Sequence, residues 1–378
     1  MRIVYCISTL AIGGAEKQAL LIADQMRRRG HVVLVLVLFS SASVELETKL
    51  PTLRLNQQRS LAGFVRGLRL ARSFLDVFGA DILHSHTYPA NLFVRLLKLS
   101  GSSGKVLNTF HNVFEGGLLR RLLYRATRGV MTSATAVSEA VRAQVMRRRI
   151  AKASRMRVIL NGISMDAYSK NPKRRAEIRR ELRVEGQFVW IAVGRVARAK
   201  DYPNLLYAFD RLREQEHHCQ LWIVGGVGQD RHEAENLHMA KQMEEAAAVR
   251  WMGAQTDVES LLDAADGFVL SSAWEGAPLV VAEAMAMELP VVATCVGGVA
   301  EILGESGELV AAGDSTALAL AMQRVMHSSQ EEIVRKTAAG RAHVLSRFAI
   351  QKIASQWEEL YRELLEQEAG RLGDKHEE

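Results

Sequence analysis

Short apolar runs alternate with longer amphipathic stretches along the whole chain. The runs are rich in β-branched residues and have the length of buried strands. We therefore expect one series of strands at 2–7, 32–38, 81–84, 105–109, 134–137 and 157–160, and a second at 188–193, 220–224, 250–252, 267–270, 291–294 and 307–310. Helical patterns lie between them, for example at 15–29, 204–216 and 279–288. Such alternation is typical of βα units with parallel sheets.

The two series indicate two domains. A chain of 378 residues is longer than one ordinary core supports. The first series ends at Asn161-Gly162, and the polar stretch 169–175 that follows has the composition of a linker. We predict an α/β protein with two doubly wound, Rossmann-like domains facing a cleft, formed by residues 1–168 and 176–349.

The C-terminal segment carries a further helical pattern at 350–366. Trp357 and Tyr361 stand four residues apart in it, on one helix face. We expect this helix to pack back on the first domain, and residues 367–378 to form a flexible polar tail.

The charge differs between the two halves. Residues 1–170 contain 26 Lys and Arg against 9 Asp and Glu, a net charge of +17, and the remainder carries −10. A basic surface attracts anionic lipid, phosphorylated ligands or nucleic acid, although it can also be merely solvated. We expect no nucleic acid partner, because no aromatic residues alternate with the arginines. No apolar run approaches the roughly 20 residues of a membrane span. A cytoplasmic protein is expected, soluble or peripheral on the inner face of the membrane.

Cysteines and histidines give little support for a metal site. Cys6, Cys219 and Cys295 lie in apolar runs without ligand spacing, so we expect buried thiols in a reducing compartment. His84 and His86 could bind a metal only with a third ligand, and the sequence offers none of suitable type. We predict no metal and no cofactor.

Two glutamates mark a candidate site. Glu275 follows a buried-strand pattern, and Glu283 lies in the helix that begins near Pro278. Taken alone, each is a surface charge. Together they place two carboxylates at the carboxyl end of a strand, where open α/β sheets bind ligands. The amides from Gly276 to Val280, through Ala277, Pro278 and Leu279, offer contacts for phosphate or sugar oxygens.

Basic and glycine-rich loops occupy equivalent positions after other strands. Arg195 and Lys200 follow Gly194 and could neutralise a diphosphate. Gly225 follows the next strand and begins a second loop whose backbone could approach a ligand closely. In the first half, Gly13-Gly14 separates a strand from its helix, which suits either an anion or a tight turn. His111 ends another strand, and we favour it for contact with substrate.

Taken in order, these residues resemble glycosyltransferase family 4, the retaining enzymes of the GT-B fold. The resemblance extends from Gly13-Gly14-Ala15-Glu16 through Thr109-Phe110-His111 and Asn161-Gly162 to Gly194-Arg195 with Lys200. It ends with Glu275-Gly276-Ala277-Pro278 and Glu283, which match the family's Glu-x7-Glu motif.

The resemblance implies a role for each residue. Arg195 and Lys200 would hold the donor's diphosphate, Glu283 would bind the ribose, and Glu275 with the amides of 277–280 would hold the transferred sugar. His111 would contact that sugar from the first domain, and Gly13 and Gly14 would approach the phosphate or sugar. The base would stack near residues 253–256. Double displacement through a carboxylate is conceivable, but the family favours attack on the same face, without an obligatory metal.

The resemblance also implies partners. The donor would be a nucleotide sugar, with a UDP-linked hexose or N-acetylhexosamine ahead of GDP-mannose. The acceptor would be a saccharide, often lipid-linked, in cell-surface polysaccharide or glycan synthesis. An anionic membrane would attract the basic half. Two alternatives stay open: a sugar-nucleotide epimerase of the same fold, and a non-catalytic basic protein that binds lipid or nucleic acid.

Overall fold

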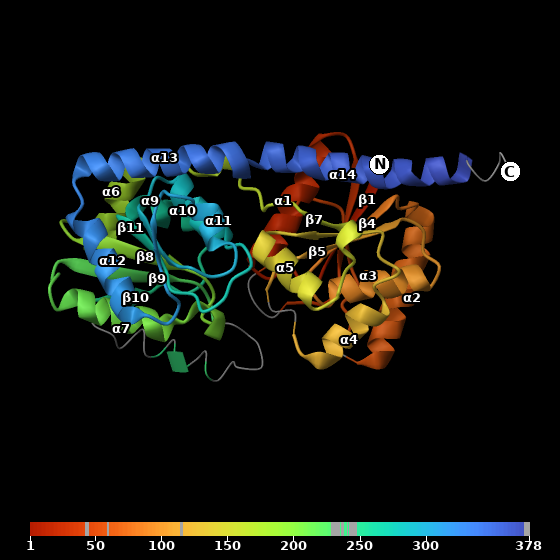
Figure 1. Ribbon diagram of the computed structural model, residues 1–378, viewed down its shortest axis with the longest axis horizontal. Coiled ribbons are helices and arrows are strands. Elements are labelled where there is room, and N and C mark those ends of the chain that lie inside the picture. Colours follow the sequence, from red (N-terminus) through yellow and green to blue (C-terminus); the bar gives the residue numbers. More distant parts are fainter. Residues whose placement is uncertain are drawn as a thin grey trace. The chain divides into compact units, whose positions relative to one another are not determined.

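The computed structural model describes residues 1–41, 45–58, 60–113, 116–227, 235, 238–239, 241 and 248–373. The chain divides into two compact units. Unit 1 comprises Met1–Gly162 with Ile350–Glu378, and unit 2 comprises Ile163–Ala349. Each unit holds one parallel β-sheet with helices around it (Figure 1). The predicted α/β class with two doubly wound domains is confirmed.

Unit 1 contains a seven-stranded sheet with the strand order β3-β2-β1-β4-β5-β6-β7. Its strands are β1 (Arg2–Ile7), β2 (Val32–Val37), β3 (Thr52–Arg54), β4 (Ile82–His86), β5 (Lys105–Phe110), β6 (Ser133–Ala136) and β7 (Met156–Val158). Its helices are α1 (Gly14–Arg28), α2 (Leu61–Phe78), α3 (Ala90–Leu99), α4 (Leu118–Ala126), α5 (Glu139–Arg147) and α14 (Ile350–Gly373). The order reverses between β1 and β4, and such a switch point creates a ligand crevice at the carboxyl ends of the strands.

Unit 2 repeats this plan with six parallel strands in the order β10-β9-β8-β11-β12-β13. The strands are β8 (Phe188–Val193), β9 (Cys219–Val224), β10 (Val249–Trp251), β11 (Gly267–Leu270), β12 (Val291–Thr294) and β13 (Glu308–Val310). The helices are α6 (Pro172–Glu181), α7 (Tyr202–Arg213), α9 (Val258–Ala264), α10 (Leu279–Ala286), α11 (Val299–Leu303), α12 (Ser315–His327) and α13 (Gln330–Phe348). Here the order reverses between β8 and β11.

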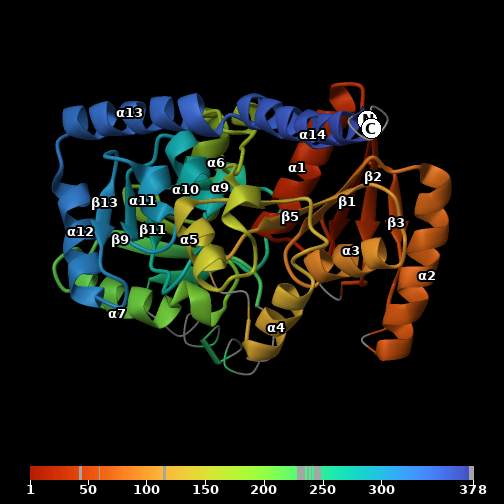
Figure 2. The same ribbon diagram turned by 45° about the vertical axis from the view of Figure 1, so that its right-hand side comes forward.

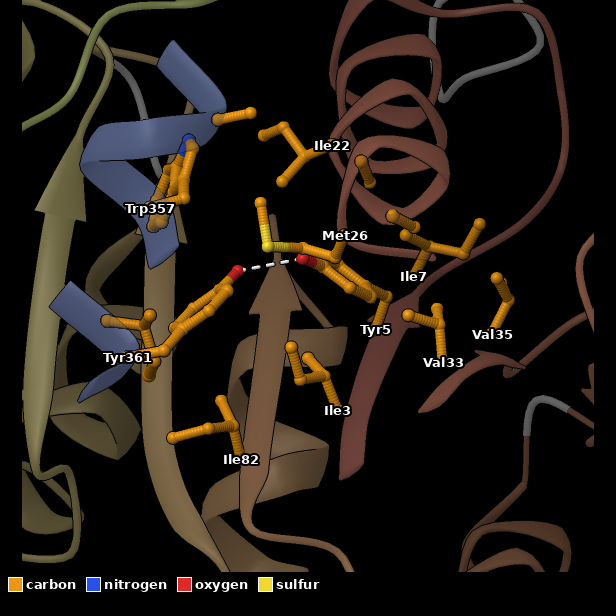
Figure 3. Close-up of a cluster of buried hydrophobic side chains, with 14 of the residues drawn as sticks. Ile3, Tyr5, Ile7, Ile22, Met26, Val33, Val35, Ile82, Trp357 and Tyr361 are labelled. Carbon is orange, nitrogen blue, oxygen red and sulfur yellow. Dashed lines mark hydrogen bonds between the residues drawn. The ribbon is translucent and has the colours of Figure 1, made fainter. Parts of the chain in front are cut away.

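Helix α14 completes the core of unit 1. Trp357 and Tyr361 are buried beside Ile3 and Tyr5 of β1. The Tyr361 and Tyr5 hydroxyls lie 2.9 Å apart in a hydrogen bond (Figure 3). The last helix of the chain therefore covers the first strand.

Several predicted boundaries differ from the structure. The polar stretch 169–175 is not a free linker, because Asn171 caps α6 and Pro172 begins it. α14 continues to Gly373, so the backbone of 367–373 is helical rather than part of a tail, and 374–378 lie outside the described residues. The edge strand β3 has only three residues and gave no recognisable pattern.

Two further predictions need correction. Cys295 is exposed, because β12 ends at Thr294 and the thiol lies in the following loop. β4 continues to His86, two residues beyond the predicted end at His84, so His86 is also a strand residue. Of the helices in the described part of the chain, none is both long and apolar enough to span a membrane.

Candidate functional site

The centre of the site in unit 2 is an ion pair between the two loops at the switch point. Lys200 Nζ donates a hydrogen bond of 2.7 Å to Glu275 Oε1, and the two side chains are 17% and 14% exposed. Lys200 comes from the loop after β8, and Glu275 from the loop after β11. Two residues that are far apart in the sequence are thus adjacent where doubly wound sheets bind ligands.

Glu275 has further support that the sequence did not reveal. The Ser272 hydroxyl donates to the same Oε1 at 2.7 Å. The Gly298 amide donates to the Gly276 carbonyl at 2.8 Å. At Gly297, where φ is +54°, an added Cβ would lie 2.0 Å from the Glu275 carbonyl oxygen. The loop after β12 therefore requires glycine in order to pack on the Glu275 backbone. The Gly297-Gly298 pair was the available sequence signal.

Glycines also shape the loop that carries Lys200. An added Cβ on Gly194 would lie 2.4 Å from Lys200 Cε, so the lysine stem crosses directly over this glycine. An added Cβ on Gly225 would lie 1.9 Å from the Gly194 carbonyl oxygen. The Gly225 amide donates to the Gly253 carbonyl at 2.7 Å. Three consecutive strand ends, those of β8, β9 and β10, are thereby packed backbone to backbone.

Arg195 lies on the same loop with an exposed side chain. It makes no ion pair with any residue that the structure describes. The Arg195 guanidinium can therefore bind an anion without breaking an ion pair with a described residue. Lys200, by contrast, already pairs with Glu275.

Helix α10 begins directly after the Glu275 loop. Pro278 is its N-cap residue, preceded by Ala277, and Leu279 and Val280 open the first turn. Amides of a first turn have no acceptor within the helix, and the helix dipole favours negative charge at this end. This end of α10 therefore suits a phosphate or sugar oxygen.

Glu283 lies on α10 and is 6% exposed. Its carboxylate accepts a hydrogen bond from the hydroxyl of Tyr168, a residue of the connection before α6. Burial, followed by the charge of Glu283, raises the pKa of Tyr168, so the hydroxyl keeps its proton and acts as a donor. No local sequence pattern predicts the role of Tyr168, because it lies far from α10 in the sequence.

The predicted site residues of unit 1 lie at the carboxyl ends of β1 and β5. Gly13 is the N-cap of α1, and Gly14 is the first residue of that helix. An added Cβ on Gly13 would lie 2.4 Å from a carboxylate oxygen of Glu16. The close approach expected of an anion at Gly13 is therefore made in this structure by an acidic side chain of the protein.

His111 follows β5 and is 7% exposed. Its Nε2 lies 2.9 Å from Nδ1 of His86. Burial lowers the pKa of His111 to about 3 and lowers the pKa of His86 well below its ordinary value. Both imidazoles are therefore neutral at physiological pH, and their contact is an ordinary hydrogen bond with one donor and one acceptor.

His84 belongs to the core and not to the site. Its Nδ1 lies 2.7 Å from the Tyr361 hydroxyl, and its Nε2 lies 2.7 Å from the Thr109 hydroxyl. Both ring nitrogens thus have protein partners, and the ring packs on Trp357 at 4.6 Å. Among the described residues, no group of three or more His, Cys, Asp or Glu side chains is placed to hold a metal ion.

Two family models match the chain, one in each unit. Residues 12–167 match Glycosyltransferase Family 4, and residues 187–328 match Glycosyl transferases group 1. Together the two matches contain every predicted site residue.

Individual relatives are distant but extend over much of the chain. The alpha-maltose-1-phosphate synthase of Mycolicibacterium smegmatis is 29% identical over 311 residues, covering 75% of this chain and 79% of that protein. The capsular polysaccharide biosynthesis glycosyltransferase CapM of Staphylococcus aureus is 25% identical over 249 residues, or 64% of each protein. The structure of Anabaena HepE in complex with UDP-glucose superposes with a TM-score of 0.83 at 21% identity, covering 96% of this chain and 100% of that one.

Proposed function

Because this chain belongs to the family 4 glycosyltransferases of the GT-B fold, we propose that it transfers a hexose or N-acetylhexosamine from a nucleotide sugar to a saccharide acceptor with retention of configuration. UDP is the preferred nucleotide. The observation that supports this proposal most strongly is the Lys200–Glu275 pair at the switch point of unit 2. It brings a cation for a phosphate and a carboxylate for sugar hydroxyls to one place.

The donor would occupy the carboxyl ends of the strands of unit 2. Arg195 and Lys200 bind the diphosphate, and the first turn of α10 binds a phosphate or sugar oxygen. Glu275, fixed by Ser272, accepts hydrogen bonds from the hydroxyls of the transferred sugar. Glu283, fixed by Tyr168, accepts them from the ribose.

Transfer would proceed on one face of the sugar. The bond between C1 and the diphosphate oxygen breaks, and its electron pair leaves with the diphosphate. The acceptor hydroxyl oxygen bonds to C1 from the same face, and its proton passes to a departing phosphate oxygen. Arg195 and Lys200 stabilise the negative charge that develops on that phosphate. In this scheme Glu275 positions the sugar and does not attack C1, and Ser272 fixes its Oε1 by a hydrogen bond.

No metal is needed in this scheme, because the two basic side chains supply the positive charge. Turnover that survives EDTA unchanged would support this, and loss of turnover that Mg²⁺ restores would contradict it.

Acceptor binding belongs to unit 1, where His111 contacts the transferred sugar. We propose a lipid-linked saccharide at the inner face of the membrane, in cell-surface polysaccharide synthesis. The net charge of +17 on residues 1–170 supports attraction to an anionic surface.

The test is a panel of UDP-, GDP- and ADP-linked sugars, monitored by thermal stabilisation and by slow donor hydrolysis. One nucleotide sugar should raise the melting temperature and release its nucleoside diphosphate. The anomeric configuration of the first product, read by NMR, should equal that of the donor. Inversion, or interconversion of the sugar without release of nucleotide, would refute the proposal.

A further inference from the structure

His86 is a buried histidine with one ring nitrogen that no described residue bonds. It ends β4, is 1% exposed, and its ring centre lies 4.2 Å from that of His84 and 6.2 Å from that of Tyr5. Its Nδ1 lies 2.9 Å from Nε2 of His111. Its Nε2 is buried without a hydrogen-bond partner among the described residues. The proposed function gives His86 no role.

The strand register brings the two histidines together on one face of the unit 1 sheet. His86 is paired with Thr109 of β5, and His111 follows Thr109 by two residues. Side chains two residues apart along a strand point to the same face. The centre of the His111 ring, one residue beyond the strand, accordingly lies 5.2 Å from that of His86. β5 itself lies between α14 and α3 in both views (Figures 1 and 2).

The hydrogen bond between the two rings could run in either direction. Burial lowers the pKa of both histidines well below its ordinary value, so both rings are neutral, and a neutral imidazole has one N–H donor and one acceptor. Either His86 Nδ1 donates to His111 Nε2, or His111 Nε2 donates to His86 Nδ1. The bond is made in both cases. The two arrangements therefore differ only at the other nitrogens, Nε2 of His86 and Nδ1 of His111.

The buried Nε2 of His86 decides between the two directions. If His111 donated, His86 would carry its proton on Nε2, where no described residue accepts it. The π-face of Tyr5 is no substitute, because an N–H bond lies in the plane of its ring and the two rings are inclined by only 25°. Buried N–H groups without an acceptor are rarer than buried acceptors without a donor. The arrangement in which His86 donates leaves only a lone pair at Nε2.

We propose that His86 is a positioning residue that fixes the tautomer of His111, so that His111 presents Nδ1–H to the substrate as a hydrogen-bond donor. Since Nε2 of His111 accepts from His86, the one proton of the His111 ring is on Nδ1. The inference rests on the proposed function for its target, which is an oxygen of the saccharide substrate. Glu275 accepts hydrogen bonds from hydroxyl groups, whereas His111 donates one to an oxygen.

This tautomer also limits the chemistry of His111. A protonated Nδ1 has no lone pair with which to take a proton, so His111 cannot be the base for the acceptor hydroxyl through this nitrogen. The assignment agrees with the proposed mechanism, in which that proton passes to a departing phosphate oxygen.

Long-range proton–nitrogen NMR of the full chain, with nitrogen-15 in its histidine rings and without substrate, tests the tautomers directly. The method distinguishes a protonated from an unprotonated ring nitrogen, and His86→Asn and His111→Asn assign the two rings. Both rings should carry their proton on Nδ1, although free histidine favours Nε2. A proton on Nε2 of His86 would overturn the inference.

Two variants of His86 separate the tautomer from packing. Leucine cannot donate to His111, whereas asparagine can donate an amide proton from near the position of Nδ1. His86→Leu should release His111 into both tautomers and lower kcat/KM for the donor about tenfold, while His86→Asn should keep the Nδ1–H form and stay within about threefold. A tenfold loss in both variants with the His111 tautomer unchanged would show that His86 acts through packing alone, and would overturn the inference.

Thr135→Val is the matched control. The Thr135 hydroxyl is buried and lies 2.7 Å from that of Thr109, so its loss perturbs the same sheet without touching the histidine pair. The tautomers and kcat/KM should both be unchanged. If His86→Leu does not fold, the NMR of the unmodified chain and of His86→Asn still decides the question.

Failure of this inference can be distinguished from failure of the proposed function, because the tautomers are read without substrate. A proton on Nε2 of His86 in a chain that still hydrolyses a nucleotide sugar would overturn the inference and leave the glycosyltransferase proposal intact. The expected tautomers in a chain that neither binds nor hydrolyses any nucleotide sugar would refute the proposed function and leave the assignment of the histidine pair standing.

Discussion

At the residue scale, Lys200 has two partners: Glu275 in the structure and a donor phosphate in the proposed function. In the proposed function it neutralises a phosphate, yet its ammonium group is already paired with Glu275 at 2.7 Å. A bound diphosphate would therefore compete with a carboxylate for this cation, and Glu275 would become freer to accept sugar hydroxyls as the phosphate arrives. Arg195 makes no such ion pair among the described residues, so we propose that it attracts the donor first.

Lys200→Ala should reduce kcat by about 100- to 1000-fold, because a preorganised charge is lost from the leaving-group site. The variant should remain folded, because Ser272 still donates a hydrogen bond to the Glu275 carboxylate. Lys170→Ala removes an exposed ion pair of similar length in unit 2, with Glu288 at 2.6 Å, and should leave kcat unchanged. Full activity of Lys200→Ala would contradict the site assignment.

We expect Tyr168 to affect donor binding through its hydrogen bond to Glu283. Tyr168→Phe keeps the buried ring and removes only the hydroxyl that donates to the carboxylate. We expect KM for the donor to rise about tenfold with kcat within about twofold, because a hydrogen bond to a charged group contributes about 1.5–3 kcal/mol. Initial-rate kinetics at saturating acceptor measure this. Tyr207→Phe, at a tyrosine that is 67% exposed, is the control. An unchanged KM would show that the Tyr168 hydroxyl does not contribute to donor binding.

At the scale of elements, glycines at the carboxyl ends of the strands in unit 2 let the neighbouring loops pack closely on one another. Gly225→Ala would force a Cβ to within 1.9 Å of the Gly194 carbonyl oxygen, at a φ of +153°. We expect a loss of about 3 kcal/mol or more in the free energy of unfolding of unit 2. Gly226→Ala meets its nearest atom at 3.4 Å and should be tolerated within about 1 kcal/mol. Urea denaturation of both variants tests this, and equal stability would refute it.

Three neutral histidines lie on β4 and directly after β5. Burial lowers the pKa of His84, His86 and His111 in the folded chain, so protons bind preferentially to the unfolded chain as the pH falls below about 6.5. The stability of unit 1 is therefore greatest above this value and declines towards pH 5, with a limiting slope of about 4 kcal/mol per pH unit for three protons.

Replacing one of these histidines should change the slope. His86→Asn removes one of the three groups that bind a proton on unfolding. It should therefore reduce the pH dependence of the free energy of unfolding between pH 6.5 and 5 by about a third, whatever its effect on absolute stability. The unmodified protein provides the reference slope. Denaturant unfolding at several pH values gives both slopes, and identical slopes would show that His86 is not neutral in the fold.

Sequence periodicity was informative for elements and weak for their contacts. It predicted β1 and β8 with their observed ends, because both are continuous apolar runs. It placed Lys200 and Glu275 at strand ends, and the strand order of a doubly wound sheet then makes them neighbours. It could not predict Ser272 or Tyr168 as partners of the glutamates, because those contacts depend on tertiary packing. It ended the predicted strand at His84, whereas β4 continues to His86, and it could not reveal that Tyr361 of α14, 277 residues further along the chain, bonds to His84 in the core.

At the scale of the whole molecule, the chain crosses between its units twice. It leaves unit 1 after Gly162 and returns at Ile350. The returning helix supplies Trp357, Leu360 and Tyr361 to the core around β1. The hydroxyl of Tyr361 bonds to Tyr5 and His84 together. Unit 1 therefore cannot complete its core until the C-terminal helix is present. Unit 2, by contrast, is formed by one continuous segment of the chain.

This arrangement predicts that the two units depend differently on α14. Trp357→Ala leaves a large cavity beside β1 and should destabilise unit 1 by about 3–5 kcal/mol, without direct effect on unit 2. Gln356→Ala, at the exposed neighbouring position of the helix, should cost less than about 0.5 kcal/mol. Hydrogen exchange read by mass spectrometry separates the units: protection should fall in β1, β4 and β5 and persist in β8 and β11. Uniform loss of protection across both sheets would mean that the chain unfolds as one cooperative body, in which the C-terminal helix stabilises the donor site as well as its own core.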